Sequence, residues 1–385
     1  MGSGLARKKV IRLLLASFLL VVLWPLRAVA EEPKPIKHVV LISIDGLSYE
    51  GYANYSKSNI KYLAIEGVSA PKCLALRADT VEAGEATLLT GSLPTEHQYY
   101  TSHDRVEAES LLDIFAKEKR GVLVVDGSGG KLKGFARGEK EYLKVAADVT
   151  DAEVMNRAMS AFKKYKPFFT YIYLNDCKEA RLNPARKAYW DAIKLSDNEV
   201  GRLVAMLKET GIYDHTVLVV TAARASTASD LVPVVIKAPQ LKPYTAVEGV
   251  TVFDIAPTIC SLVGVSEPYS ANGLTIWDAF QARDQKEEIN LMERHIRGLE
   301  QERLQSWLRY YQLDRERLRL LRQIQEIKDE RERIFGYAGE REHTIGSLRE
   351  SLFRTRAGAL ILTGILLLGY YVEYRLLKKR FTLFH

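Results

Sequence analysis

Short runs of apolar, β-branched residues alternate with amphipathic segments between residues 37 and 282, an order that predicts strands followed by helices. Strands are expected at 38–44, 122–126, 168–174, 216–221 and 232–236, and helices at 58–66, 107–118, 150–164 and 185–210. Thr150 and Glu153 form a capping-box pattern at the start of the third helix. Continuously apolar strands are typical of parallel sheets that are buried on both faces. The predicted fold class is therefore α/β, with a mostly parallel central sheet and helices on both faces.

The first predicted strand ends on Asp45, which is followed at once by Gly46. Open α/β sheets bind their ligands at the carboxyl ends of the strands. Asp45 is therefore the first candidate site residue.

Beyond residue 284 the composition changes to Glu, Arg, Leu and Gln without proline, and apolar residues recur three and four positions apart. This spacing predicts a long helical stalk over 284–353 that contacts a protein partner or a second copy through 284–352. Arg303 and Arg331 interrupt the apolar seam. A helical hairpin is the alternative, because Gly336 and Gly339 weaken one turn.

Both ends of the chain carry apolar runs. Residues 1–30 have a basic start, an apolar run and Ala28-Val-Ala30, which predicts a secretory signal peptide, with an uncleaved anchor as the alternative. The uncharged run at 357–372 predicts a transmembrane helix over 354–374, followed by a basic cytoplasmic tail at 375–385. The expected protein is a single-pass protein of the cell membrane, with its main domain (31–283) outside the cytoplasm.

Composition and charge limit the classes of partner that the protein is expected to bind. Of 385 residues, 47% are hydrophobic, which suits a globular core, and the net charge of +7 is spread among acidic residues. Aromatic residues are not interleaved with the basic ones, so no nucleic-acid partner is expected. The cysteines at 73, 177 and 260 lack zinc-binding spacing, and whether two of them form a disulfide is left open.

Four motifs occur in an order that is similar to the alkaline phosphatase superfamily. They are Ile42-Ser-Ile-Asp-Gly46, Ala86-Thr-Leu-Leu-Thr-Gly-Ser-Leu-Pro-Thr-Glu-His97, Asp197-Asn-Glu-Val-Gly201 and Asp254-Ile-Ala-Pro-Thr258. The chain most resembles the phosphodiesterase, nucleotide pyrophosphatase and sulfatase-like branches, roughly over residues 37–282.

The resemblance implies two metal ions, typically zinc, held by about six Asp and His side chains, and a Thr or Ser nucleophile at a helix start. Asp45 and Asp176 match metal-ligand positions, and His97 lies in a turn that is structural in the family. The nucleophile position falls on Val81, and its neighbour Thr80 is the candidate. Alternatively, this segment is an ordinary helix start that is capped by Asp79.

Several ligand positions carry other residues. The expected histidine after Asp176 is Ala180, the expected Ser-Asp-His-Gly is Thr221-Ala-Ala-Arg224, and residues 225–231 contain no histidine. We therefore expect no cofactor, and we hypothesise that Arg224 or Arg181 occupies the vacated metal position and pairs with Asp45 and Asp176. The alternative is that Arg224 points to solvent.

Two functions follow from these residues, and whether the protein is an enzyme stays open. The favoured hypothesis is a membrane-anchored, catalytically inactive domain of the superfamily that acts in extracytoplasmic binding or assembly. The alternative is an active phosphodiesterase, phosphatase or sulfatase-like hydrolase that uses Thr80 and Asp45 with zinc or another divalent metal.

Overall fold

The computed structural model describes residues 34–55, 58–76, 80–137, 141–178, 186–224, 230–282 and 284–381. These residues fall into two compact units that divide between Arg303 and Leu304. The predicted signal peptide, Asp79 and Arg181 lie outside the described residues.

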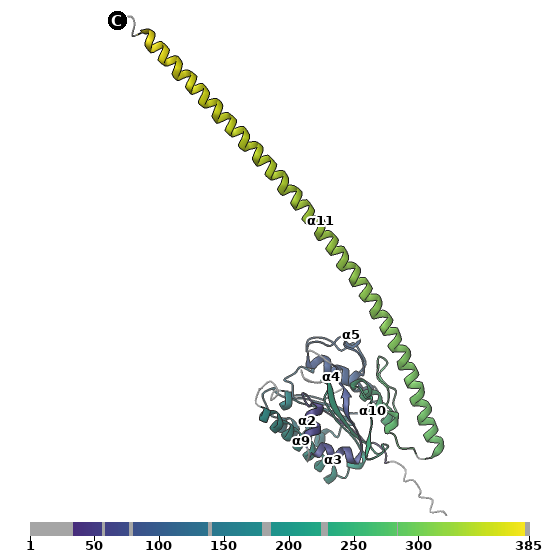
Figure 1. The fold of residues 1–385 in the computed structure, drawn as a ribbon. Coiled ribbons are helices and arrows are strands. Elements are labelled where there is room, and N and C mark those ends of the chain that lie inside the picture. The colour runs from purple at the N-terminus through teal and green to yellow at the C-terminus, as the bar shows by residue number, and fades with distance from the viewer. Residues whose placement is uncertain are drawn as a thin grey trace, which may run out of the picture. The chain divides into compact units, whose positions relative to one another are not determined.

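An eight-stranded sheet in the order β4-β3-β5-β1-β6-β7-β2-β8 forms the centre of the first unit (Figure 1). The strands are β1 (His38–Ile44), β2 (Val68–Leu74), β3 (Val122–Asp126), β4 (Glu141–Lys144), β5 (Phe169–Leu174), β6 (Thr216–Thr221), β7 (Leu231–Lys237) and β8 (Thr245–Ala246). β7 runs antiparallel to β6 and β2, and the other neighbouring pairs are parallel. The predicted mostly parallel sheet is confirmed.

Helices cover the sheet on both faces. They are α2 (Tyr49–Asn54), α3 (Asn59–Glu66), α4 (Val81–Thr90), α5 (Pro94–His97), α6 (Leu111–Lys117), α7 (Asp151–Tyr165), α9 (Arg186–Glu209) and α10 (Ile255–Val263). α9 packs against α3 and α7, whereas α4 packs against α5, α6 and α10. Side chains alternate along β1, so the face that carries Ser43 meets α4, while Ile42 and Ile44 point to the opposite face.

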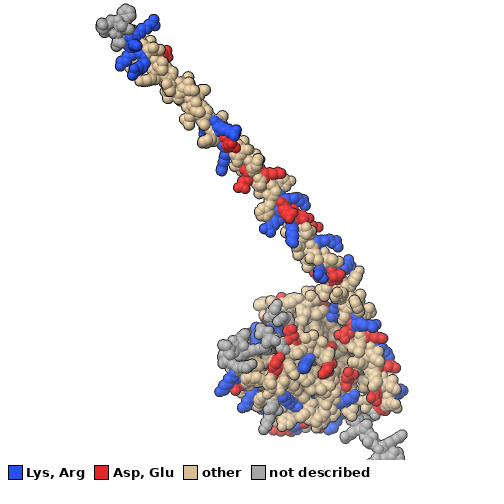
Figure 2. Space-filling view, viewed as in Figure 1, with Lys and Arg blue, Asp and Glu red and all other residues tan. Residues whose placement is uncertain are grey.

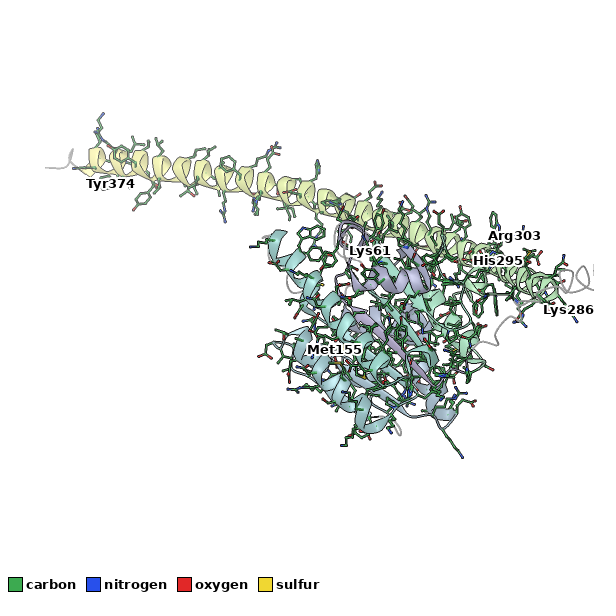
Figure 3. All side chains as sticks on the ribbon, turned by 90° about the horizontal axis from the view of Figure 1, so that it is seen from below. Lys61, Met155, Lys286, His295, Arg303 and Tyr374 are labelled. Carbon is green, nitrogen blue, oxygen red and sulfur yellow. The ribbon has the colours of Figure 1, made fainter. Side chains whose placement is uncertain are left out.

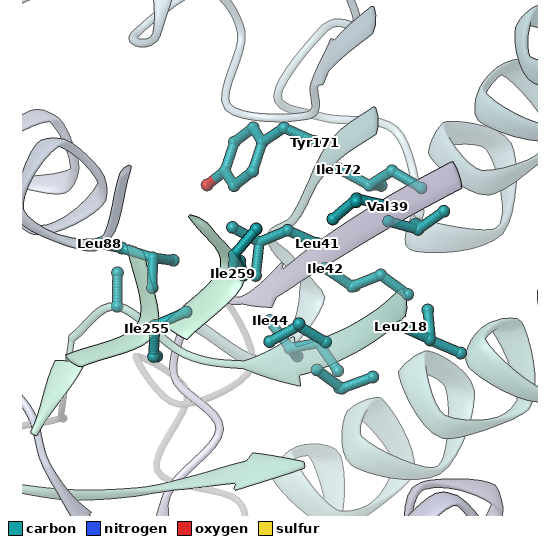
Figure 4. Packing of buried hydrophobic residues seen from close by; sticks show 14 of the residues in the cluster. Val39, Leu41, Ile42, Ile44, Leu88, Tyr171, Ile172, Leu218, Ile255 and Ile259 are labelled. Carbon is teal, nitrogen blue, oxygen red and sulfur yellow. The ribbon is translucent and has the colours of Figure 1, made fainter. Parts of the chain in front are cut away.

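The core centres on β1, whose residues 39–44 are completely buried. Figure 4 shows Leu41 of β1 close to Ile259, with Leu88 and Ile255 in the same group of side chains. Cys73, Cys177 and Cys260 are buried free thiols, so the disulfide that the sequence left open is not formed.

Most predicted boundaries lie within one or two residues of the observed elements, but the helix expected at 107–118 begins only at Leu111. Its start is set by Ser110 and Asp113, whose side chains each accept a hydrogen bond from the other's backbone N–H. The sequence did not predict β2, which contains Pro71, or the short strand β4, none of whose residues is buried.

The last element, α11 (Gln285–Phe381), is one helix of 97 residues. It continues through Gly336 and Gly339, so the helical hairpin is wrong. Its first turns belong to the first unit, where Leu291 packs on the core and the Arg294 guanidinium lies 5.1 Å from the Trp277 ring centre. His295 and Arg303 lie in this part of α11, and Tyr374 lies near its other end (Figure 3).

Within the second unit, charged and apolar segments of α11 are separate. Figure 2 shows basic and acidic side chains mixed along the helix, then a segment without charges, then a basic cluster near its end. By length and composition, α11 includes a stretch that is apolar enough to cross a membrane.

Candidate functional site

The loop that follows β1 holds Asp45 at the carboxyl edge of the sheet. Its backbone N–H donates to the Leu174 carbonyl at 3.0 Å, and its side chain is 3% exposed. Gly46 has a φ of +92°, and a Cβ there would lie 2.8 Å from the backbone N and Cα of Lys178. Glycine is therefore required for the β1 and β5 loops to approach each other.

Asp45 forms a buried ion pair with Arg224. Arg224 Nη2 donates to Asp45 Oδ2 at 2.6 Å, and the Tyr173 hydroxyl donates to the same oxygen at 2.6 Å. Burial, reinforced by the Asp45 charge, raises the pKa of Tyr173, so its hydroxyl stays protonated. Because the Arg224 side chain is only 13% exposed, the alternative in which it points to solvent is wrong.

The aliphatic part of Arg224 lies directly on Gly84 of α4. A Cβ built on Gly84 would lie 2.1 Å from Arg224 Cγ and 2.5 Å from Cδ, so any side chain here has to displace the arginine. An isolated parallel β-bridge between Leu76 and Arg224 positions the backbone of the arginine. Gly84 thus provides the space through which the guanidinium reaches Asp45.

We expect Gly84→Ala to destabilise the protein by about 1 kcal/mol net, because overpacking against Arg224 outweighs the gain in helix propensity. In an Arg224→Ala background the obstacle is gone, and the same change should stabilise α4 by about 0.5–1 kcal/mol. Denaturant unfolding of the four variants measures both values. Equal effects in the two backgrounds would contradict the contact.

A second carboxyl group, that of Glu85 in α4, lies close enough to Asp45 and Arg224 to feel both charges and is fully buried. It accepts hydrogen bonds from Ser43 Oγ at 2.9 Å and from the Tyr171 hydroxyl. Burial, together with the Asp45 charge, raises the pKa of Glu85 to about 8. A protonated Glu85 makes the set of Asp45, Arg224 and Glu85 electrically neutral.

Asp176, the other predicted metal ligand, acts at a helix start instead. Its Oδ2 accepts the Asp151 backbone N–H at 3.0 Å, and Asp151 Oδ1 accepts the backbone N–H groups of Asn175 and Asp176 at 2.8 and 3.1 Å. Thr150 is the N-cap residue as predicted, but the expected capping box with Glu153 is wrong, since the Thr150 side chain makes no cap hydrogen bond. Asp176 therefore caps α7, while Arg224 is bonded to Asp45.

Thr80, the candidate nucleophile, is the N-cap of α4. Its Oγ1 accepts the Ala83 backbone N–H at 3.2 Å. It precedes Gly84 by one helical turn and so lies on the face of α4 that meets Arg224. The helix start itself was predicted, but the capping residue is Thr80.

The remaining motif residues hold the structure together. His97 is buried between Thr87 Oγ1 and the Tyr99 backbone N–H, and burial lowers its pKa to about 4. Asp197 accepts the backbone N–H groups of Asn59 and Ile60, which caps α3. The Asp254 carboxylate accepts hydrogen bonds from the backbone N–H groups of Thr251 and Leu274. His97, Asp197 and Asp254 therefore make structural hydrogen bonds within the first unit.

The donor set does not fit a two-metal centre. Across the described ranges, no group of three or more His, Cys, Asp and Glu residues is placed to hold a metal ion. Ala222 and Ala223 are fully buried beside the Asp45 strand and offer no donor atom. Arg181 lies outside the described residues.

Sequence reasoning missed the side chains that surround the ion pair: Ser43, Gly84, Glu85, Tyr171 and Tyr173. No local sequence pattern marks the two tyrosines. Their position beside the ion pair follows from the strand register, in which Leu41 pairs with Tyr171 and Ser43 with Tyr173. A glutamate within the apolar helix 81–90 was the signal for Glu85, since such a group requires buried partners.

The structure is similar to solved hydrolases. Human ectonucleotide pyrophosphatase/phosphodiesterase 5 matches with a TM-score of 0.54 at 12% identity over 64% of this chain and 100% of that chain. The phosphonate monoester hydrolase SpPMH from Silicibacter pomeroyi gives 0.50 at 17% over 62% and 76%, respectively. The 2-O GAG sulfatase BT1596 gives 0.52 at 15% over 63% and 73%.

No family model and no curated protein matches the sequence. At these identities the structural similarity concerns the fold. The mostly parallel sheet, its helices on both faces and the position of Asp45 at the carboxyl edge of β1 agree with the four sequence motifs. The first unit therefore has the fold of the alkaline phosphatase superfamily.

Proposed function

We propose that the first unit is a metal-free, non-hydrolytic domain that acts in binding or assembly outside the cytoplasm, anchored to the cell membrane by α11. The observation that carries the proposal is the buried ion pair between Asp45 and Arg224. The anchor and its orientation rest on the signal-peptide pattern at 1–30, the uncharged run at 357–372 and the basic residues that follow it.

The positive charge of Arg224 is the reason why its pair with Asp45 argues against metal binding. The guanidinium supplies the positive charge that a carboxylate at this edge requires, and it approaches within hydrogen-bonding distance. A divalent cation would have to displace Arg224, whose stem is held against Gly84. After that displacement the cation could bind Asp45, but it would gain no ligand from positions 222 and 223, because both carry alanine.

An assay for metal and turnover tests the proposal. We expect the full-length chain, purified in detergent, to bind less than one equivalent of zinc or manganese. We also expect no turnover of nitrophenyl phosphate, bis-nitrophenyl phosphate or nitrophenyl sulfate with either metal added. Mass spectrometry of bound metal and nitrophenol absorbance are the measurements.

Two matched variants control for contaminating enzymes. Thr80→Ala removes the hydroxyl, whereas Thr80→Ser keeps both the hydroxyl and the cap. Stoichiometric metal, together with turnover that survives in Thr80→Ser and disappears in Thr80→Ala, would contradict the proposal and establish the hydrolase that uses Thr80 and Asp45.

A further inference from the structure

The second unit carries a continuous heptad pattern along α11. Its a positions are 310, 317, 324, 331, 338, 345 and 352, and its d positions are 313, 320, 327, 334, 341 and 348. All of them are apolar except Arg317, Arg331 and Arg341. The large apolar members are 49–66% exposed on the described helix. This seam of apolar residues has the spacing of a coiled coil.

Each seam arginine has a glutamate at the flanking position that faces the seam of a second helix. Arg317 and Arg331 occupy a positions, and Glu316 and Glu330 precede them at g. Arg341 occupies a d position, and Glu342 follows it at e. In a parallel coiled coil, g residues of one helix flank the a layer of the other, and e residues flank the d layer.

These glutamates can act between helices as well as within one, since Arg319 and Arg333 lie three residues after Glu316 and Glu330 on the same helix. Adjacent residues of one helix do not face each other, so Glu316 is poorly placed for Arg317 of its own chain. In many parallel coiled coils, a charged g residue pairs with the e residue five positions later on the other helix, but Glu316 and Glu330 have no charged partner there. Glu316 and Glu330 would meet Leu321 and Phe335 there. The arginines of a second copy are their remaining partners across the seam.

We propose that residues 310–352 form a parallel, in-register, two-stranded coiled coil with a second copy of this chain. Charged a positions cost stability but fix register and favour two strands. Two copies whose apolar segments at 357–372 enter one membrane also run in the same direction. That last point rests on the proposed anchoring, whereas the charge pairing is independent of it.

Cysteine cross-linking of the full-length chain in membranes tests the register. In a parallel, in-register pair each d residue meets its own copy at a distance that a disulfide can bridge. Leu320→Cys and Ile327→Cys should therefore give disulfide-linked dimers. Arg322→Cys, at the outward f position, is the matched control, and the native cysteines are buried in the first unit. Yields at 320 and 327 no higher than at 322 would overturn the proposal.

A charge exchange tests the identity of the partner. In the Leu320→Cys background, Glu330→Arg and Arg331→Glu should each lower the dimer yield several-fold, because like charges then meet at one layer. The double variant exchanges both signs and should recover the parent yield. A double variant as weak as the singles would overturn self-pairing and favour a different helical partner. The readout involves neither metal nor hydrolysis, so its failure leaves the proposed function of the first unit untouched.

Discussion

Replacing Arg224 with methionine should lower the free energy of unfolding by about 3–5 kcal/mol, because Asp45 then remains as a buried charge without its counter-ion. Methionine keeps an unbranched apolar stem over Gly84, so lost packing contributes little. Denaturant unfolding of the full-length chain in detergent measures the change. A loss below about 1 kcal/mol would show that the pair is unimportant for stability.

Two further variants separate the charge from the packing. Asp45→Asn combined with Arg224→Met removes both charges and should recover most of the loss. Asp45→Asn alone should cost less than Arg224→Met, because Glu85 can ionise and supply the counter-charge. Arg202→Met is the matched control, since Arg202 is 47% exposed in its pair with Glu199 and should change stability by less than about 1 kcal/mol.

The sequence predicted the sheet better than the site. Apolar runs at 38–44, 122–126 and 216–221 coincide with β1, β3 and β6, because a strand buried on both faces has to be apolar throughout. β2 and β4 are partly exposed and carry mixed residues, so periodicity could not find them. The stalk helix was predicted, but the glycines at 336 and 339 had suggested a break that α11 does not have.

At the site, the sequence showed the replaced ligands and suggested Arg224 as the partner of Asp45, but it did not show the other contacts. Ala222, Ala223 and Arg224 identified the altered loop, and the hypothesis that Arg224 approaches Asp45 required only that loop. The position of Asp176 at the start of α7 depends on how two loops meet, which no local pattern encodes. The role of Gly84 depends on a contact between residues 140 positions apart, 84 and 224.

Glu85→Gln should stabilise the protein at pH 8 by on the order of 2 kcal/mol, because it removes a buried acid that must ionise or hold its proton at a cost. The pKa of Glu85 rises from 4.5 to about 8 on folding, mainly through burial. The folded state therefore binds the extra proton, and the stability linked to Glu85 is complete below about pH 4.5 and is lost as the pH rises to about 8. Glutamine can still accept from Tyr171 and donate to the Ser43 oxygen.

The measurement is the free energy of unfolding from pH 4.5 to pH 9 for the parent and the variant. The parent should lose stability across this interval more steeply than Glu85→Gln, and the two curves should diverge as the pH rises. Two other buried groups titrate in this interval in both proteins: burial raises the pKa of Asp151 to about 6, which lowers stability as the pH rises, and lowers the pKa of His97 to about 4, which raises it. These two contributions oppose each other and are common to both curves, so the difference between the curves reports Glu85. Glu153→Gln is the control, because Glu153 is exposed and its pKa is lowered by Arg157, which gives a small effect of opposite sign.

Parallel curves for parent and Glu85→Gln would mean that Glu85 is ionised in the fold. Arg224 would then be shared between two carboxylates, and the neutral arrangement of Asp45, Arg224 and protonated Glu85 would be wrong.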